Sequence, residues 1–133
     1  ESPRHGLVAA RQEGLDGIEL WQSNHAGRVA QARALAAVLR TSAHPLVVGG
    51  DLNSPDASAA MQALLAIGLR DAFATAGRGW GYTYGHTLRP RFSFLRIDHV
   101  LVSDDVDVVR AFTGGKEASD HRPLIADLRL PQR

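Results

Sequence analysis

The stretch Pro45-Leu-Val-Val-Gly-Gly-Asp-Leu-Asn53 joins an apolar run to two glycines and then to two polar side chains. A short apolar run that stops at glycines is typical of a buried strand. Asp51 and Asn53 lie two positions apart, so in an extended chain both side chains point to the same side. The stretch therefore predicts a carboxylate beside an amide at a strand exit, where the glycines let a ligand approach the backbone. The alternative is that both residues only cap the turn into the next helix.

Composition limits the class of protein before any motif is considered. A chain of 133 residues is expected to form one domain with an adequate core. Its 15 basic and 14 acidic residues give no polyanion-binding signature from net charge. The absence of cysteine excludes disulfides and thiolate metal sites and leaves the compartment open. No apolar run reaches membrane-spanning length, and the start at Glu1 rather than Met indicates a piece of a longer protein.

Hydrophobic spacing predicts alternating helices and strands along the chain. The expected helices are residues 28–40 and 59–67, and the expected strands are 5–12, 18–22, 46–49, 97–103, 106–112 and 123–130. Residues 54–56 are expected to cap the second helix, and residues 69–76 to form a further helical turn or an irregular crossover. The alternation of Tyr82 and Tyr84 suits another strand. Mixed elements with polar residues at strand ends indicate a layered α/β domain.

Three polar clusters lie at predicted strand boundaries: Asp51 with Asn53, Asp98 with His99, and Ser119-Asp120-His121. Asp98 sits in an otherwise apolar strand, where a carboxylate is costly unless it is paired. His121 is the best candidate partner, because a carboxylate fixes the tautomer of an imidazole and favours its protonated form. Asp120 stays available for a divalent cation. His99 is expected to face the opposite side from Asp98 and to serve packing rather than chemistry.

Together these groups suit the hydrolysis of a phosphate ester. Asp51 orients or deprotonates a water and Asn53 donates to a phosphoryl oxygen, while His121, steadied by Asp98, neutralises developing charge. Asp120 helps to hold a metal ion. The alternative is that these common polar residues occur at such positions by chance and form no site.

The wording of three motifs supports the first interpretation. The motifs are Gly50-Asp51-Leu52-Asn53, Arg96-Ile97-Asp98-His99-Val100-Leu101 and Ala118-Ser119-Asp120-His121-Arg122-Pro123-Leu124. In order and spacing they resemble the three late motifs of the endonuclease/exonuclease/phosphatase superfamily. The segment Gly79-Trp80-Gly81-Tyr82-Thr83-Tyr84 further resembles bacterial members. The resemblance runs from about His5 to Leu130.

The resemblance implies a role for each matching residue. Asp51 would be the water-activating carboxylate and a metal ligand, Asn53 the phosphate-contacting amide, and Asp120 a metal-side carboxylate. His121 would pair with Asp98 and contact the substrate. The implied cofactor is Mg²⁺ or Mn²⁺, and the family's substrates run from nucleic acids to phosphoinositides and sphingomyelin. The implied fold is half of a four-layer α/β/β/α sandwich, a mixed and mostly antiparallel sheet with helices on one face.

Two departures from the family pattern define the alternatives. Residues 1–133 resemble only the second half of the domain, whereas the first half normally supplies an asparagine and a glutamate to the metal site. Glu19 also stands where a phosphate-contacting histidine is expected. A half-sandwich exposes an apolar sheet face, so we expect a missing N-terminal segment, self-association through that face, or a weakly ordered chain.

Two functional hypotheses therefore remain. The first is a metal-dependent phosphoesterase, incomplete on its own, and the second is a degenerate or truncated non-catalytic remnant of the same fold. A nucleic-acid-binding module without chemistry is disfavoured by the near-neutral charge. Residues 89–96, rich in Arg and Phe, suit either contact with a polyanion or lipid surface or a partly packed loop. Trp80, Tyr82 and Tyr84 are expected to pack in the core or at its rim. The substrate, the choice between monoester and diester, the metal and the localisation stay undetermined.

Overall fold

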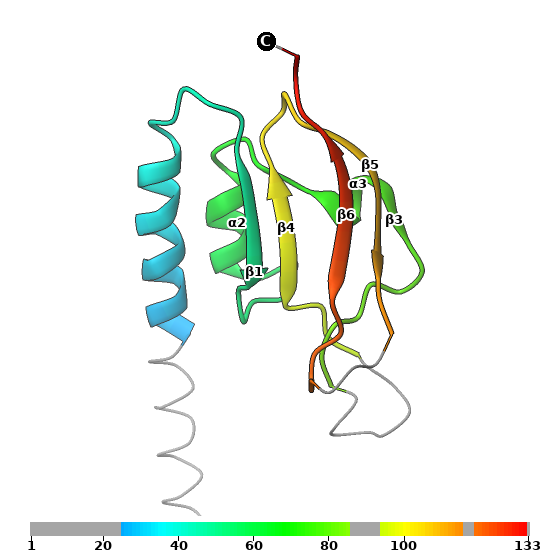
Figure 1. Ribbon diagram of the computed structural model, residues 1–133. Helices are drawn as coiled ribbons and strands as arrows, with labels where there is room; N and C mark the ends of the chain where they lie inside the picture. The colour runs from blue at the N-terminus through cyan, green and yellow to red at the C-terminus, as the bar shows by residue number, and fades with distance from the viewer. Residues whose placement is uncertain (1–24, 86–93, 116–118, 133) are drawn as a thin grey trace, which may run out of the picture.

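A computed structural model describes residues 25–85, 94–115 and 119–132 of the chain (Figure 1). Residues 25–39 are helical. The elements that follow are β1 (Val47–Asp51), α2 (Ala59–Leu65), β2 (Arg70–Asp71), α3 (Ala72–Ala76), β3 (Gly77–Arg78), β4 (Asp98–Val102), β5 (Asp107–Thr113) and β6 (Leu124–Arg129). Neither helix expected from the sequence is missing, and the four strands expected after residue 45 appear as β1, β4, β5 and β6. The strands expected at residues 5–12 and 18–22, and Glu19 with them, lie outside the described residues.

Three local predictions were wrong in detail. Ser58, rather than the segment 54–56, caps α2, because its side chain accepts from the Met61 amide at 3.2 Å. Residues 69–76 contain the short strand β2 before α3, which completes a sheet edge that local spacing does not reveal. The segment with Tyr82 and Tyr84 forms only isolated bridges at Tyr84, since positive-φ glycines at 79, 81 and 85 interrupt an extended conformation.

The described strands form two small sheets. In the first, β4 lies between β1 and β2 and is antiparallel to both. In the second, β5 lies between β6, to which it is antiparallel, and β3, to which it is parallel. The two sheets meet where β4 contacts β6. This mixed and mostly antiparallel α/β arrangement agrees with the half-sandwich expected from the sequence.

The helices cover one face of the first sheet. Leu101 of β4 is fully buried in the core cluster with Ala36 of the helix of residues 25–39 and with Met61 and Leu64 of α2. Because side chains alternate along a strand, His99 points to the same side as Leu101, whereas Asp98 and Val100 point to the other. Burial of these apolar side chains is the main stabilisation of the layer.

The opposite side of the first sheet, formed by Val47, Gly49, Asp51, Asp98, Val100 and Val102, is called here the open face, and Val102, at the end away from the carboxylates, is fully buried. Register places Asp51 directly across from Asp98 and Gly49 across from Val100. Val47 is 49% exposed although it is a strand residue. The two carboxylates therefore lie at one end of a sheet face that the described helices leave uncovered.

None of the described helices combines the length and the apolar character needed to cross a membrane.

The contact between Gly81 and α3 yields a test of the fold. The backbone φ of Gly81 is 69°, and a Cβ there would lie 2.5 Å from two ring carbons of Phe73. We expect Gly81→Ala to lower the free energy of unfolding by about 1–3 kcal/mol. The control Gly27→Ala, in a helix with no atom within 4 Å of the new Cβ, should raise it by up to about 1 kcal/mol. Urea unfolding measures both, and equal effects would contradict the described packing.

Candidate functional site

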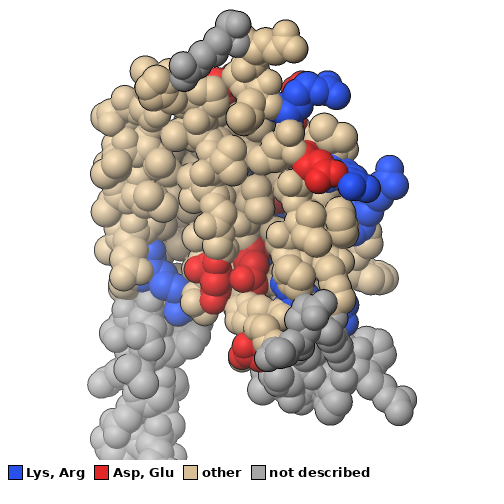
Figure 2. Space-filling model, in the orientation of Figure 1, with Lys and Arg blue, Asp and Glu red and all other residues tan. Residues whose placement is uncertain are grey.

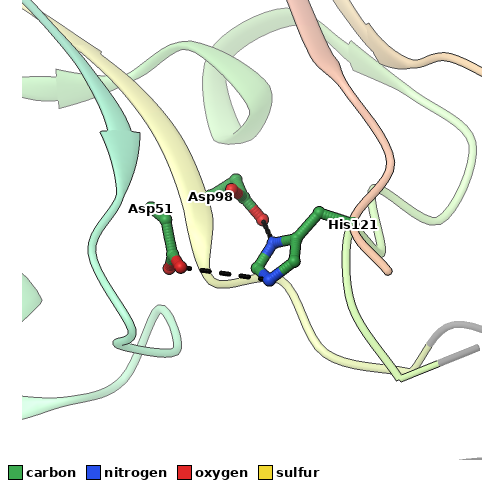
Figure 3. Close-up of side chains that lie close together, drawn as sticks. All are labelled: Asp51, Asp98 and His121. Carbon is green, nitrogen blue, oxygen red and sulfur yellow. Dashed lines mark hydrogen bonds and ion pairs between the residues drawn. The ribbon is translucent and has the colours of Figure 1, made fainter. Parts of the chain in front are cut away.

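Asp51, Asp98 and His121 meet at one end of the molecule because of strand direction. β1 ends at Asp51, β4 begins at Asp98, and their antiparallel pairing makes the two residues neighbours. His121 comes three residues before β6 and enters the same end of the sheet. Figure 2 shows acidic side chains gathered at this end, and Figure 3 shows one imidazole nitrogen directed at Asp98 and the other at Asp51. Residues far apart in sequence thus form one cluster.

One nitrogen of the His121 imidazole is hydrogen-bonded, and the other faces a second carboxylate. Its Nδ1 lies 2.8 Å from Asp98 Oδ2, and its Nε2 lies 3.9 Å from Asp51 Oδ2. The hydrogen bond to Asp98 raises the pKa of His121, partial burial opposes this, and the charges of Asp98, Asp51 and Asp120 raise it further. The structure therefore favours a protonated ring that presents Nε2 toward Asp51.

This arrangement predicts that Asp98→Asn lowers the pKa of His121 toward its ordinary value of 6.5. NMR titration of the imidazole carbon–proton signals measures that pKa directly. Asp120→Asn is the control and should lower the pKa less, because Asp120 acts through its charge alone and is the last of the causes. If the two variants shift the pKa equally, the Asp98 hydrogen bond is not the main cause.

The raised pKa of His121 also determines how the stability of the fold depends on pH. A raised folded-state pKa means that the pair stabilises the fold fully below pH 6.5 and loses this contribution as pH rises through the higher folded-state value.

Asn53 reaches Asp51 through a turn rather than along a strand. β1 ends at Asp51, and Asn53 adopts a left-handed φ of 47°, so the chain does not stay extended as far as Asn53. The backbone N–H of Asn53 donates to Asp51 Oδ1 at 2.8 Å, and its side-chain Nδ2 donates to Asp51 Oδ2 at 3.2 Å. Asp51 therefore caps this turn, as one of the two alternatives expected, and its Oδ2 also faces His121, while its role toward a ligand stays a prediction.

Neighbouring residues support the position of His121. Its backbone N–H donates to the Ser119 hydroxyl at 3.1 Å, and its ring lies 4.8 Å from the ring of Tyr84. Asp120 is exposed, and its charge acts on the neighbouring His121. The Thr83 hydroxyl accepts from the backbone N–H groups of Ile97 and Asp98, each at 3.3 Å. Residue pattern alone does not reveal that Thr83 holds the start of β4.

The aromatic segment is only partly packed. Tyr84 is half-buried against His121, as expected for rim packing. Trp80 is 82% exposed and stacks on Tyr82 with ring centroids 6.2 Å apart, so the expectation of packing was wrong for Trp80. The positive φ of Gly81 between the two rings turns the chain outward.

A second polar cluster lies on the opposite side of β4 from the first, the side that the helices cover. The Arg96 guanidinium bonds both oxygens of Asp71 at 2.8 and 2.9 Å, and it also lies 2.6 Å from an Asp56 oxygen. His99 Nδ1 lies 2.8 Å from Asp71 Oδ2, one of the two oxygens that Arg96 also bonds. Burial would raise the pKa of Asp71, but hydrogen bonds from His99, the Ala74 amide and Arg96, with the Arg96 charge, lower it to about 2.

This second cluster settles two sequence expectations. His99 does face away from Asp98 and is 1% exposed, but it bonds polar groups rather than packing only against apolar ones. Arg96 is turned inward to acidic partners, so it is not available to a polyanion or lipid. Residues 89–93 of the Arg- and Phe-rich segment 89–96 lie outside the described part of the chain.

Comparison with known proteins places the chain in a family. A sequence model described as the Endonuclease/Exonuclease/phosphatase family matches residues 13–121. The chain belongs to this family. Among solved structures, an endonuclease/exonuclease/phosphatase from Bacteroides vulgatus is 30% identical with a TM-score of 0.68, covering 77% of this chain and 44% of that protein. Comparison with curated proteins finds no match.

Two further solved structures resemble the fold of this chain. A Bacteroides thetaiotaomicron mannosyl-6-phosphatase is 24% identical with a TM-score of 0.60, covering 77% of this chain and 46% of that protein. A functionally unknown conserved protein from Enterococcus faecalis is 21% identical with a TM-score of 0.67, covering 79% of this chain and 45% of that protein. At these identities the likeness shows the fold alone. The chain spans less than half the length of each of the three solved structures.

Proposed function

We propose that this chain carries the second half of a divalent-metal-dependent phosphoesterase, which hydrolyses a phosphodiester or phosphomonoester with an activated water. The observation that carries the proposal is the held imidazole: Asp98 fixes Nδ1 of His121, and Nε2 points toward the Asp51 carboxylate. A protonated imidazole beside an ionised carboxylate supplies both charges that phosphate-ester hydrolysis needs. Membership of the endonuclease/exonuclease/phosphatase family supports the same reaction class.

Each residue has a defined task in this proposal. Asp51 orients the attacking water and takes its proton, since its carboxylate is partly exposed at the mouth of the cluster. Asn53, bonded to Asp51 through its amide, holds that carboxylate in place and can turn its side chain to a phosphoryl oxygen. Nε2 of His121 donates to a phosphoryl oxygen and neutralises the charge that develops there.

The residues present fit a divalent cation at this end of the sheet. Asp51, Asp98 and His121 each offer a ligand atom, and these atoms lie within 4.8 Å of one another. Asp98 is already bonded to His121, and a protonated imidazole has no free lone pair for a metal, so we propose that Asp51 holds the ion together with Asp120, the exposed carboxylate next to His121 in the chain. Carboxylate oxygens are the donors that Mg²⁺ and Mn²⁺ prefer. Such an ion supplies Lewis-acid stabilisation of the phosphoryl oxygens when it is bound.

The open face indicates how the site is completed. The chain matches less than half the length of its structural relatives, and Val47 on this face is half exposed. We propose that residues 1–133 are one partial domain whose open face is covered by a further N-terminal segment, which adds ligands to the metal site. Self-association through the same face is the alternative, and analytical ultracentrifugation distinguishes a dimer from a monomer.

The substrate is a phosphate ester of a kind that the described residues do not specify, because substrate choice in such folds lies in variable loops. A solved structure of similar fold is described as a mannosyl-6-phosphatase, so sugar phosphates join nucleic acids and phospholipid head groups as candidate substrates once generic esters are hydrolysed.

The experiment measures release of product from bis-p-nitrophenyl phosphate and p-nitrophenyl phosphate, with Mg²⁺, Mn²⁺ or excess chelator. It uses the 133-residue chain and, in parallel, the polypeptide extended by its own upstream coding sequence. We expect metal-dependent hydrolysis in the extended form and little in the chain alone. If both forms bind no metal and hydrolyse neither ester, the proposal fails and the non-catalytic remnant is favoured.

A further inference from the structure

Both ring nitrogens of His99 face atoms that only accept hydrogen bonds. The ring is 1% exposed on the helix-covered side of β4. Its Nδ1 lies 2.8 Å from a carboxylate oxygen of Asp71, and its Nε2 lies 2.9 Å from the backbone carbonyl oxygen of Ser54. Both partners can only accept, since a carbonyl has no proton and the Asp71 carboxylate, whose pKa is lowered to about 2, accepts from Arg96 on both oxygens. Both contacts are hydrogen bonds only if each ring nitrogen carries a proton.

Charged groups surround the ring. Asp71 and Asp56 bring two carboxylates to the cluster, Asp56 Oδ1 being 4.0 Å from His99 Nδ1, and Arg96 brings one cation. Asp71 is 7% exposed, whereas Asp56 is 58% exposed and stays in contact with water. The ring and Arg96 therefore face one buried carboxylate, which would be costly without such polar partners.

The same cluster is a poor metal site although three of its residues have suitable ligand atoms. Asp56, Asp71 and His99 offer atoms within 4.8 Å of one another. The Arg96 guanidinium, however, already contacts both oxygens of Asp71 and one oxygen of Asp56. A divalent cation would have to displace a cation that is itself only 9% exposed. The cluster is therefore better explained as a fixed structural element.

What this element holds is the turn that carries Asn53. At one end of the turn the Leu52 amide donates to the Ile97 carbonyl at 2.9 Å, and at the other His99 holds the carbonyl of Ser54. Asn53 lies between these two attachments with a φ of 47°, a conformation that costs free energy outside glycine. A strained residue keeps its conformation only when its surroundings hold it there.

We propose that His99, anchored by Asp71, is a positioning residue: its Nε2–H holds the Ser54 carbonyl and so keeps Asn53 in the turn that bonds Asp51. The role of the turn in hydrolysis rests on the proposed function, whereas the hold on the turn does not. His99 lies on the opposite side of β4 from Asp98, so it acts through the turn and does not touch the substrate.

Two amide variants separate the two hydrogen bonds of the ring. In His99→Asn the amide nitrogen lies near the place of Nδ1 and keeps a donor toward Asp71, but nothing reaches Ser54. In His99→Gln the amide nitrogen lies near the place of Nε2 and keeps a donor toward Ser54. Amide hydrogen exchange at Asn53, whose N–H bonds Asp51, reports the turn, and exchange at Leu101 in β4 reports global stability.

We expect His99→Asn to speed exchange at Asn53 about tenfold or more relative to Leu101, and His99→Gln to change this ratio less than threefold. A ratio that stays constant in both variants would show a merely structural role and overturn the proposal. Nitrogen-15 NMR of the wild-type ring gives a second decision, because a bare nitrogen on His99 at neutral pH also overturns it.

Activity measurements keep this inference separate from the proposed function. In an active form of the protein, His99→Asn should lower kcat per folded molecule about tenfold with little change in KM, and His99→Gln should restore most of it. If no form is active, the exchange ratio and the ring NMR still decide whether His99 holds the turn. Faster exchange at Asn53 without any hydrolysis would refute the proposed function and leave the positioning role standing.

Discussion

His121→Ala is expected to lower kcat for metal-dependent phosphate-ester hydrolysis by about 10²–10⁴-fold, the range that a positioned acid or base contributes. The variant removes the Nε2 donor that faces Asp51 at 3.9 Å and leaves Asp98 without its 2.8 Å partner. Asp51→Asn should have an effect of similar size, because it keeps the shape of the side chain and loses the charge that accepts a proton. Steady-state kinetics on p-nitrophenyl esters measure both.

His44→Ala is the matched control, because His44 is exposed, precedes the start of β1 and is separated from Asp51 by the length of that strand, so it should leave kcat unchanged. The variants act on one unit, so the double variant should lose little more than either single one. Hydrolysis that survives both His121→Ala and Asp51→Asn would show that the chemistry lies elsewhere in the protein. Circular dichroism and urea unfolding establish that each variant is folded.

Arg96→Met is expected to lower the free energy of unfolding by about 3–5 kcal/mol, because it leaves the buried Asp71 carboxylate without its guanidinium partner. Arg96 is 9% exposed and Asp71 is 7% exposed, so water replaces little of the lost interaction. The Arg96 guanidinium also lies 5.0 Å from the ring centroid of Phe73, and methionine keeps much of this packing. Urea unfolding at neutral pH measures the change.

Arg110→Met provides the comparison, because Arg110 pairs with Asp127 at the surface, where both side chains are about half exposed. An exposed ion pair of this kind contributes about 0–1 kcal/mol, so this variant should cost far less than Arg96→Met. Equal losses in the two variants would contradict the buried network described here.

Unfolding by acid tests the buried network around Asp71 independently. The folded-state pKa of Asp71 is about 2, below its ordinary 3.8, so its pairing stabilises the fold above pH 3.8. This contribution, about 2 kcal/mol, is lost as pH falls from about 4 to about 2. In Arg96→Met the pKa of Asp71 should rise, and the wild-type protein should therefore lose more stability over this acid range than the variant.

Much of the fold and part of the candidate site follow from local sequence. The apolar run before Gly49 predicts β1, and an acid within the apolar run of β4 predicts a partner for Asp98. That argument pointed to His121, and the structure places its Nδ1 2.8 Å from Asp98. The chemical roles of these residues stay a prediction, because geometry alone does not show turnover.

Other features depend on contacts that local pattern does not contain. Ser54 looks like a helix cap in sequence, but it is 3% exposed and its carbonyl is bonded by His99, 45 residues away. Arg96 looks like a surface cation beside Phe94, but β4 pairs with β2 and so brings Asp71 within 2.8 Å of it. β2 itself has two residues and no periodicity to detect.

The sequence by itself determined which segments are helical or extended and that a carboxylate in β4 requires a partner, because periodicity and the cost of burying charge act locally. Only the tertiary structure decided which side of β4 became the reactive cluster and which became the buried network around His99. The physical reason is alternation: Asp98 and His99 are adjacent in the chain, but a strand points them to opposite faces, and packing of the helices chooses the covered one.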